Sequence, residues 1–313
     1  MSTAVKAPNE LLPRLKSAAR AARDVPLVNR LLLAPFKMAK SAGIQLPHGV
    51  YQHLPYRGLV SVDCGAGRRF SMRSYGHQLE NGLFWRGLAG HEPETLPVWI
   101  RLAERSKIVL DIGANTGLFS LAAAAASPRA EVHAFEPVAR IHALLVRNVA
   151  LNPGFNITPH ECAIGAEEGT LDLHDPGGDI CYSASLDGGF LKGATTMERY
   201  PVRVRSVDAI VRERGWSSVD LVKLDIEGYE DQALAGMATT LEKLRPIILI
   251  ELLEHTKTGA AVARLTQSGY VLYSLSERGP MKGRVPHAPG ASSHASRNVL
   301  LVPEERCSAV DEP

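Results

Sequence analysis

The sequence predicts an α/β protein with a doubly wound, mostly parallel sheet, and three observations support this prediction. First, residues 108–165 alternate strand-like apolar runs with helix-like runs, which is the βαβ rhythm of a parallel sheet. Second, a glycine-containing turn joins the first of these strands to its helix. Third, the same alternation resumes at residue 221 after an interruption. Ligands of such sheets bind at the carboxyl ends of the strands, so polar residues at those ends are the first site candidates.

Composition is that of an ordinary globular protein. The 313 residues are 45% hydrophobic and 22% charged, which allows one large domain with an extension or two small domains. A net charge of +2 gives no electrostatic reason to expect nucleic acid as a partner. The four cysteines form no C-x-x-C pair, which argues against zinc and fits a reducing cytosol. No apolar run approaches the roughly 20 residues of a membrane span and no secretory signal begins the chain, so we expect a cytoplasmic protein without a transmembrane segment.

Residues 1–57 are predicted to form a basic helical extension, before a main domain over 58–305 and a tail over 306–313. Eight Lys or Arg residues face two acidic residues in the first 45 positions, and leucines recur there at helical spacing. Such a segment suits an anionic membrane surface. Pro13, Pro26 and Pro35 interrupt any long helix, however, so packing on the chain's own domain or on a second subunit of a homo-oligomer is favoured.

The remaining elements follow from local patterns. Residues 58–75 alternate around a Gly-Ala-Gly turn and predict a hairpin. An inserted pair of strands, 169–175 and 201–208, flanks a Gly/Ser-rich loop that we expect over the active-site edge. The predicted helices are 94–105, 121–126, 141–151, 231–243 and one that ends near 268. The predicted core strands begin at 108, 131, within 156–165, at 221, at 247, and in an antiparallel pair at 270–277 and 297–303.

The segment VLDIGANTGLFS, residues 109–120, forms the glycine turn and narrows the choice of ligand. Gly113 and Gly117 bracket the turn. In a dinucleotide loop, G-x-G-x-x-G, the second glycine lets the backbone approach a pyrophosphate, but here Asn115 stands in its place. Asp111 adds a negative charge at the strand tip, which opposes a phosphate and suits an ammonium and a sulfonium. The sequence therefore predicts S-adenosylmethionine as the cofactor.

Glu136 ends the second strand, nineteen residues after Gly117. A carboxylate there can accept both ribose hydroxyls of a nucleoside. This feature does not separate S-adenosylmethionine from NAD, because both carry that ribose. The alternative is an acid near a helix N-terminus, with Pro137 at the first helical position.

Acidic residues also follow the fourth and fifth strands. Strand alternation would place Asp225 and Glu227 on the same side, where one could orient the methionine amine or act as general base. Together with Glu251 they are a candidate oxygen-ligand set for Mg²⁺. The structural alternative is that Glu227 caps the next helix or pairs with Lys223. His255 is a further candidate base near neutral pH, or an ordinary loop histidine.

Together these residues resemble the FkbM-type family of S-adenosylmethionine-dependent methyltransferases. The matching pieces lie in that family's order over roughly residues 60–303, and K-x-D-x-E-G-x-E at Lys223–Glu230 is much more specific than the widespread D-x-G-A-N-x-G. The resemblance implies a class I methyltransferase fold and O-methylation of a sugar or natural-product hydroxyl. By position it assigns Asp111, Gly113, Asn115 and Gly117 to the methionine half, Glu136 to the ribose and the Ala163 backbone to adenine. Its candidate bases are Asp225, Glu227, Glu251 and His255.

The expected reaction is an in-line displacement in which the protein aligns the hydroxyl, the methyl carbon and the sulfur. Asp225, His255 or a bound Mg²⁺ would assist loss of the hydroxyl proton. The expected acceptor is a small hydroxylated molecule, such as a sugar, a macrolide or a glycan. One alternative is an NAD-dependent oxidoreductase or epimerase, against which Asn115, Asp111 and the missing third glycine argue. The other is a methyltransferase-like scaffold without catalysis.

Overall fold

The computed structural model describes residues 25–175, 177, 186, 198–252, 258–275, 280–282 and 298–311. The chain divides into two compact units, one of residues 1–60 and 73–91 and one of residues 61–72 and 92–313. Strands β1 (Arg57–Asp63) and β2 (Arg69–Tyr75) pair as the predicted hairpin and contribute residues to both units. The boundary expected between residues 57 and 58 stays a prediction.

The second unit contains an eight-stranded sheet with the order β12-β11-β13-β10-β9-β3-β4-β5. The strands from β10 to β5 in this order are parallel, β13 is antiparallel to β10, and β11 is antiparallel to β13. The doubly wound, mostly parallel sheet is thereby confirmed. Its strands are β3 (Ile108–Ile112), β4 (Glu131–Phe135), β5 (Ile157–His160), β9 (Leu221–Leu224), β10 (Ile247–Glu251), β11 (Tyr270–Ser274), β12 (Met281–Lys282) and β13 (Asn298–Pro303).

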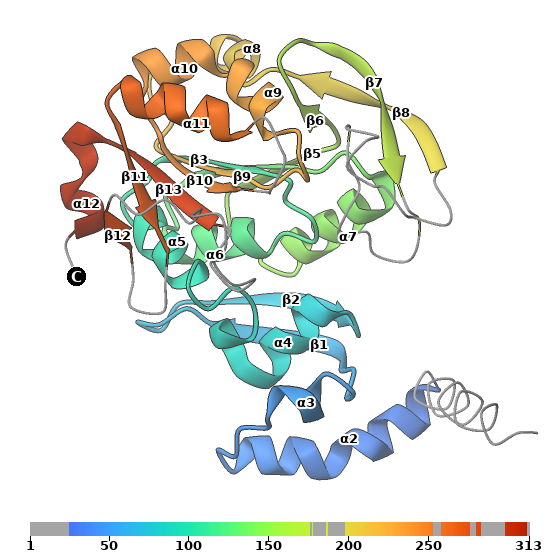
Figure 1. The fold of residues 1–313 in the computed structure, drawn as a ribbon. Coiled ribbons are helices and arrows are strands. Elements are labelled where there is room, and N and C mark those ends of the chain that lie inside the picture. The colour runs from blue at the N-terminus through green and yellow to red at the C-terminus, as the bar shows by residue number, and fades with distance from the viewer. Residues whose placement is uncertain are drawn as a thin grey trace, which may run out of the picture. The chain divides into compact units, whose positions relative to one another are not determined.

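Helices cover both faces of this sheet (Figure 1). One face carries α8 (Val207–Arg214), α9 (Glu230–Ala235), α10 (Ala238–Lys243) and α11 (Thr258–Gln267). The other carries α5 (Leu96–Ala103), α6 (Leu118–Ala126) and α7 (Ala139–Ala150). Short helical turns follow β13, namely η3 (Glu304–Arg306) and α12 (Ser308–Asp311). Because both faces are covered, β10 is buried from Ile247 to Ile250 and reads as a continuous apolar run.

The path of the chain creates a switch point between β3 and β9. From β3 the chain moves through β4 to β5 at one edge, and it then returns to β9 on the other side of β3. In open α/β sheets, ligands bind beyond the carboxyl ends of the strands at such a reversal. The exits of β3 and β9 are therefore the expected location of a ligand.

A second, three-stranded sheet has the order β6-β8-β7, from β6 (Ala163–Ile164), β7 (Gly169–Asp175) and β8 (Glu198–Arg205). The antiparallel pair β7–β8 confirms the predicted insertion. Asp175, fully buried, accepts hydrogen bonds from Arg140 on α7 and from Tyr200 on β8, the latter at 3.0 Å. Nearly all of the loop between these strands, with its predicted place over the active-site edge, lies outside the described residues.

The predicted helix over 231–243 is instead two helices, α9 and α10, separated at Gly236 and Met237. A β-carbon on Gly236 would lie 2.0 Å from the carbonyl oxygen of Gly165, so the chain approaches another backbone at this point. The predicted strand over 201–208 also ends early, because Ser206 accepts the N–H of Ala209 and caps α8. Both differences depend on contacts that hydrophobic periodicity does not encode.

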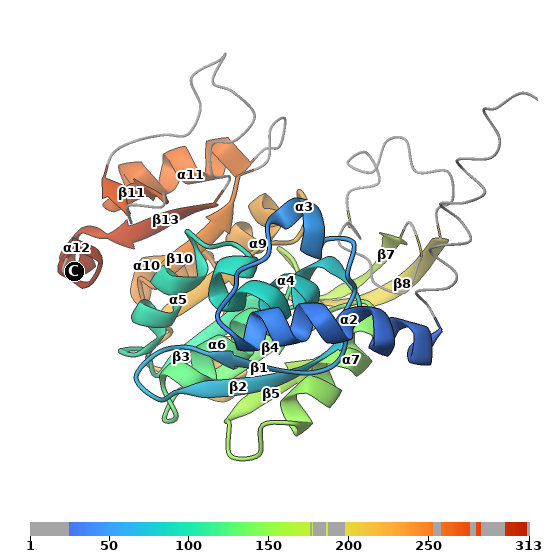
Figure 2. The same cartoon turned by 90° about the horizontal axis from the view of Figure 1, so that it is seen from below.

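The first unit contains α2 (Pro26–Ser41), α3 (His48–Tyr51), α4 (Gln78–Arg86) and η2 (Gly87–Gly90). Helices α2, α3 and α4 lie together in this unit (Figure 2). Leu33 of α2, Tyr51 of α3 and Trp85 of α4 form its small core. The expected interruption at Pro35 is wrong, since α2 continues through it to Ser41. The packing of Leu33 and its neighbour Phe36 on this core outweighs the hydrogen bond that proline removes. Among the described residues, no helix combines the length and apolar character that crossing a membrane requires.

Candidate functional site

The loop after β3 touches the segment after β9. Gly113 has a φ of +85°, and a β-carbon there would lie 1.9 Å from the backbone oxygen of Asp225. Gly117 also has a positive φ, and a β-carbon on it would meet the side chain of Leu145. Asn115, with a φ of +49°, adopts the left-handed conformation that asparagine tolerates better than most residues. The loop is thus a tight turn pressed against the switch point.

The backbone donors of this loop are used within the protein. All five N–H groups from Gly113 to Gly117 donate hydrogen bonds. Two go to the carbonyl of Phe135, at 3.0 and 2.9 Å, and one goes to the carboxylate of Glu136, at 3.0 Å. The other two are accepted inside the loop, by the Asn115 side chain and the Ala114 carbonyl. A pyrophosphate is bound by donors of this kind, so the loop is not arranged for one.

Asp111 lies beneath the loop. Its side chain is fully buried, at the fourth of the five residues of β3. One carboxylate oxygen, Oδ2, accepts the hydroxyl of Ser120 at 2.6 Å, and Oδ1 has no hydrogen-bond partner among the described residues. Burial raises the pKa of Asp111, and the positive charge of Lys223 opposes that rise. The site therefore holds a buried acceptor oxygen to which nothing described donates.

Glu136 follows β4 and is 5% exposed. Its two oxygens accept the N–H groups of Asn115, at 3.0 Å, and Val138, at 2.9 Å. Burial raises the pKa of Glu136 to about 7, although these hydrogen bonds favour the ionised form. Helix α7 begins at Ala139, so the placement of Pro137 at the first helical position is wrong, although Glu136 does lie just before a helix, whose N-cap residue is Val138. A carboxylate oxygen has two acceptor positions, so each oxygen retains one for a ligand hydroxyl.

The acidic residues after β9 meet Glu251 at the end of β10. Strand β9 ends at Leu224, and Glu227 lies in a turn with a φ of +55°, so strand alternation does not orient it. The segment after β9 nevertheless places the negative charges of Asp225 and Glu227 near Glu251, and Glu251 is hydrogen-bonded to Asp225. Burial first, and then the negative charges of Asp225 and Glu227, raise the pKa of Glu251. The carboxylates predicted at the two strand ends are therefore neighbours.

Lys223 supplies a buried positive charge beneath these carboxylates. Its Nζ lies 2.6 Å from Asp225 Oδ2 and 4.5 Å from the ring centroid of Phe119. The expected alternative pairing was with Glu227, but the ion pair is with Asp225. Burial alone would lower the pKa of Lys223, but the surrounding carboxylates outweigh burial and raise it. Those carboxylates are Asp225, Glu92 and Asp111.

Sequence reasoning missed Glu230, the last acid of the K-x-D-x-E-G-x-E segment. Its side chain is fully buried, and Oε1 accepts the N–H groups of Ile226 and Gly228, both at 3.1 Å. Thr258 of α11 donates its hydroxyl to Oε2 at 3.3 Å. Glu230 thereby fixes the turn that carries Glu227. Its position within the motif was the available signal.

The other predicted site residues have different outcomes. Ala163 is buried and begins β6, soon after the end of β5, opposite Val204 in the second sheet. His255 lies outside the described residues. Within the part of the chain that the structure describes, no group of three His, Cys, Asp or Glu residues could hold a metal ion. The structure therefore does not support the Mg²⁺ site expected at Asp225, Glu227 and Glu251.

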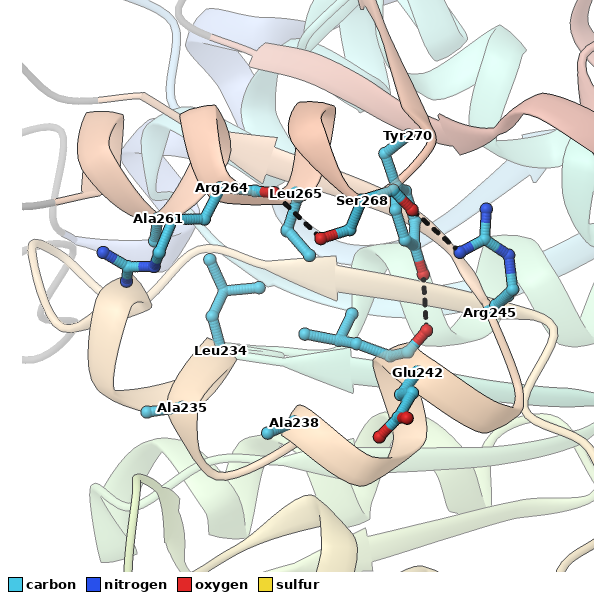
Figure 3. A pocket seen from close by; sticks show the side chains of 11 residues that line it. Leu234, Ala235, Ala238, Glu242, Arg245, Ala261, Arg264, Leu265, Ser268 and Tyr270 are labelled. Carbon is cyan, nitrogen blue, oxygen red and sulfur yellow. Dashed lines mark hydrogen bonds between the residues drawn. The ribbon is translucent and has the colours of Figure 1, made fainter.

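One pocket, with a volume of about 360 Å³, lies between the α9–α10 segment and α11 (Figure 3). Leu234 and Ala238 line one side of it and Leu265 the other, with Arg245 and Tyr270 at one end. Tyr270 pairs with Pro303 at the start of β11 and so lies level with the amino end of β10. This pocket is thus distinct from the site at the carboxyl ends of the strands.

The strand order, the glycine loop and the acidic strand ends define a class I methyltransferase fold. The family model of the methyltransferase FkbM domain matches residues 111–272, and the chain belongs to this family. The family resemblance and the fold class predicted from the sequence are thereby confirmed.

Individual relatives are similar over part of their length. The chain is 29% identical over 174 residues to the AMB antimetabolite synthetase AmbE of Pseudomonas aeruginosa, covering 45% of this chain and 8% of AmbE. It is 29% identical over 154 residues to the 2-O-methyltransferase NoeI of Sinorhizobium fredii, covering 46% and 63%. It is 26% identical over 192 residues to the hexuronic acid methyltransferase AglP of Haloferax volcanii, covering 61% and 73%. The chain therefore spans less than two thirds of the first two.

We expect the Glu251→Gln variant to change how stability depends on pH. The folded-state pKa of Glu251 is raised from 4.5 to about 8, so its contribution to stability is full below the unfolded pKa and is lost as the pH rises through the folded value. Glutamine does not ionise and keeps a donor for Asp225. Urea unfolding across this range should show the wild type losing free energy of unfolding relative to the variant as the pH rises. Glu242→Gln, on the exposed side of α10, is the control. Parallel curves for wild type and Glu251→Gln would contradict the assignment.

Proposed function

We propose that this protein transfers the methyl group of S-adenosylmethionine to a hydroxyl of a small acceptor, such as a sugar or a natural product. The observation that carries the proposal is the loop Gly113–Gly117, whose five backbone donors are used internally above a group of buried carboxylates. Such a loop offers negative charge rather than free N–H donors. That favours a cationic nucleoside ligand over a dinucleotide, and so argues against the NAD-dependent alternative.

The residues of the chain fit this cofactor. We assign the methionine half to the loop with Asp111 beneath it, the ribose hydroxyls to Glu136 and the adenine to the backbone near Ala163. When bound, S-adenosylmethionine supplies an activated methyl group on a positively charged sulfur. The carboxylates of Asp111, Asp225 and Glu251, at the ends of β3, β9 and β10, favour that positive charge, and the buried cation beside them is Lys223.

We assign acceptance of the hydroxyl proton to Asp225. The ion pair with Lys223 Nζ, at 2.6 Å, fixes the position of one carboxylate oxygen, and the Asp225 side chain is 30% exposed, so it is accessible from solvent. Glu251 is hydrogen-bonded to Asp225 and so also helps to hold the Asp225 carboxylate in place. The acceptor class follows from the relatives, one named as a 2-O-methyltransferase and another as acting on a hexuronic acid.

The direct test is mass spectrometry of candidate acceptors after incubation with the protein and S-adenosylmethionine. The proposal predicts that a hydroxylated acceptor gains the mass expected when a methyl group replaces one hydrogen. The matching compound without that hydroxyl should gain no mass. Methylation of both would place the methyl group elsewhere than on that hydroxyl. Binding of S-adenosylhomocysteine without any methylated product across sugars and macrolides would favour the non-catalytic scaffold.

The Asp225→Asn variant should lose at least about a hundredfold in turnover, because loss of a positioned base typically costs that much. Its affinity for S-adenosylhomocysteine should stay within about tenfold, since asparagine still offers Lys223 an acceptor oxygen. Turnover, calorimetric affinity and melting temperature would be measured together. Asp231→Asn is the matched control, because that acid lies in the same segment and is bonded to Gln232. Full turnover of Asp225→Asn would remove Asp225 from the mechanism.

A further inference from the structure

Exposed apolar side chains gather in the first unit, far in sequence from the strand ends of the proposed site. Of the eleven large hydrophobic residues exposed among those described, eight belong to this unit. Three of them, Leu27, Leu31 and Met38 of α2, have exposed fractions of 67%, 66% and 74%. These are the highest values in the group, and such residues in a small region indicate a surface with a partner.

These three side chains share one face of α2, which we call the outer face. Their spacing of four and seven residues places them in one stripe along the helix. The covered face of the same helix carries Leu33, which packs on Tyr51 and Trp85. Helix α2 therefore has two apolar faces, and the described residues cover one.

The charges around the outer face are of one sign. Helix α2 contains Arg30, Lys37 and Lys40 and no acidic residue. Lys37 lies over the ring of Tyr56, 5.6 Å from its centroid, and Lys40 over the ring of Phe84, at 5.5 Å. By helical spacing Lys37 lies about 100° around the helix from Met38, at the margin of the outer face, whereas Lys40 lies on the side that meets its own unit.

The same sign extends through the whole first unit. Its described residues include six Lys or Arg and one acid, Glu80, which is 1% exposed. Over residues 1–60 and 73–91 the sequence has eleven Lys or Arg and three Asp or Glu, whereas the rest of the chain has 24 and 30. The chain has a net charge of only +2, yet it is strongly basic in the part that carries the exposed apolar face.

We propose that the outer face of α2 binds the surface of an anionic lipid bilayer. An apolar stripe enters the boundary between headgroups and acyl chains, while flanking cations meet anionic headgroups, each contributing on the order of 1 kcal/mol. A second copy of this chain, bound through its own outer face, would instead bring Arg30 and Lys37 against the same cations. Charge complementarity therefore selects the bilayer over the homo-oligomer, and this inference does not depend on the proposed methyl transfer.

The test is flotation of the intact chain with vesicles of phosphatidylglycerol and phosphatidylcholine, or of phosphatidylcholine alone. We expect binding to the anionic vesicles, weakened by salt and at least about tenfold stronger than to the neutral ones. The combined variant Leu27→Ser, Leu31→Ser, Met38→Ser should bind the anionic vesicles at least about tenfold less, with an unchanged melting temperature. The matched control is Val146→Ser with Leu151→Ser, which removes exposed apolar groups from the end of α7 and should bind as the wild type does.

Other outcomes overturn the proposal. These are no vesicle binding by the wild type, equal binding to neutral and anionic vesicles, and a triple variant that binds like the wild type. Light scattering after size-exclusion chromatography tests whether the outer face instead joins two copies of the chain. A wild-type dimer that the triple variant converts to a monomer would make the outer face an interface between copies of the chain.

Discussion

Alanine at Gly113 should abolish cofactor binding and destabilise the second unit by about 3 kcal/mol or more, since it adds a backbone clash to backbone strain. The added β-carbon would lie 1.9 Å from the backbone oxygen of Asp225, and neither backbone is a flexible side-chain end that could move aside. To relieve this clash, the segments that follow β3 and β9 must move apart, and the proposed site lies at these segments. Urea unfolding and calorimetric titration with S-adenosylhomocysteine measure the two effects.

Gly215 provides the control for this prediction. It also has a positive φ, +65°, but a β-carbon there would meet nothing within 4 Å. Gly215→Ala should therefore cost only the conformational strain, about 1 kcal/mol, and retain the affinity of the wild type. Equal losses in the two variants would mean that the contact between the two strand exits does not matter.

Replacing Lys223 with methionine should cost about 3–5 kcal/mol in the free energy of unfolding, the range seen when one partner of a buried ion pair is removed. Lys223 is nearly inaccessible, with a side chain 5% exposed. Without its charge, the fully buried Asp111 and its neighbour Asp225 lose the cation that interacts with both of them. Burial already raises the pKa of Asp111, and loss of Lys223 removes the charge that opposes this rise.

The cost of the Lys223 variant should depend on pH. A carboxyl group whose folded-state pKa is raised destabilises the folded state increasingly as the pH rises, so the loss should be larger at alkaline than at acidic pH. Lys243→Met, at an exposed position on α10, should stay within about 0.5 kcal/mol of the wild type. A Lys223→Met variant as stable as this control would show that the carboxylates do not need the lysine.

Much of the fold was predictable because its signals are local. Burial on both faces makes β3, β9 and β10 apolar except for Asp111, Lys223 and the terminal Glu251, and the glycine turn after β3 marks the first βα unit. The split between α9 and α10 was not predictable in this way, since it depends on the approach of Gly236 to Gly165. Helices α4 and α8 were also missed.

The site, like the fold, has a part that local sequence signals predict and a part that they do not. Asp111, Glu136, Asp225 and Glu251 could be selected because they stand at strand ends, where the topology brings them together. Their mutual contacts could not, because a turn with a left-handed Glu227 replaces the strand geometry assumed there. The role of Glu230 in holding that turn depends on hydrogen bonds to Ile226 and Gly228, which no periodicity encodes.

The central claim is that the site at the switch point binds S-adenosylmethionine, and thermal unfolding with S-adenosylhomocysteine or NAD⁺ tests it most directly. At a hundred times its dissociation constant, a ligand of the folded state adds about 2.7 kcal/mol of stability. We predict this stabilisation with S-adenosylhomocysteine, its absence with NAD⁺, and its loss in Gly113→Ala but not in Gly215→Ala. Stabilisation by NAD⁺ with none by S-adenosylhomocysteine would contradict the account.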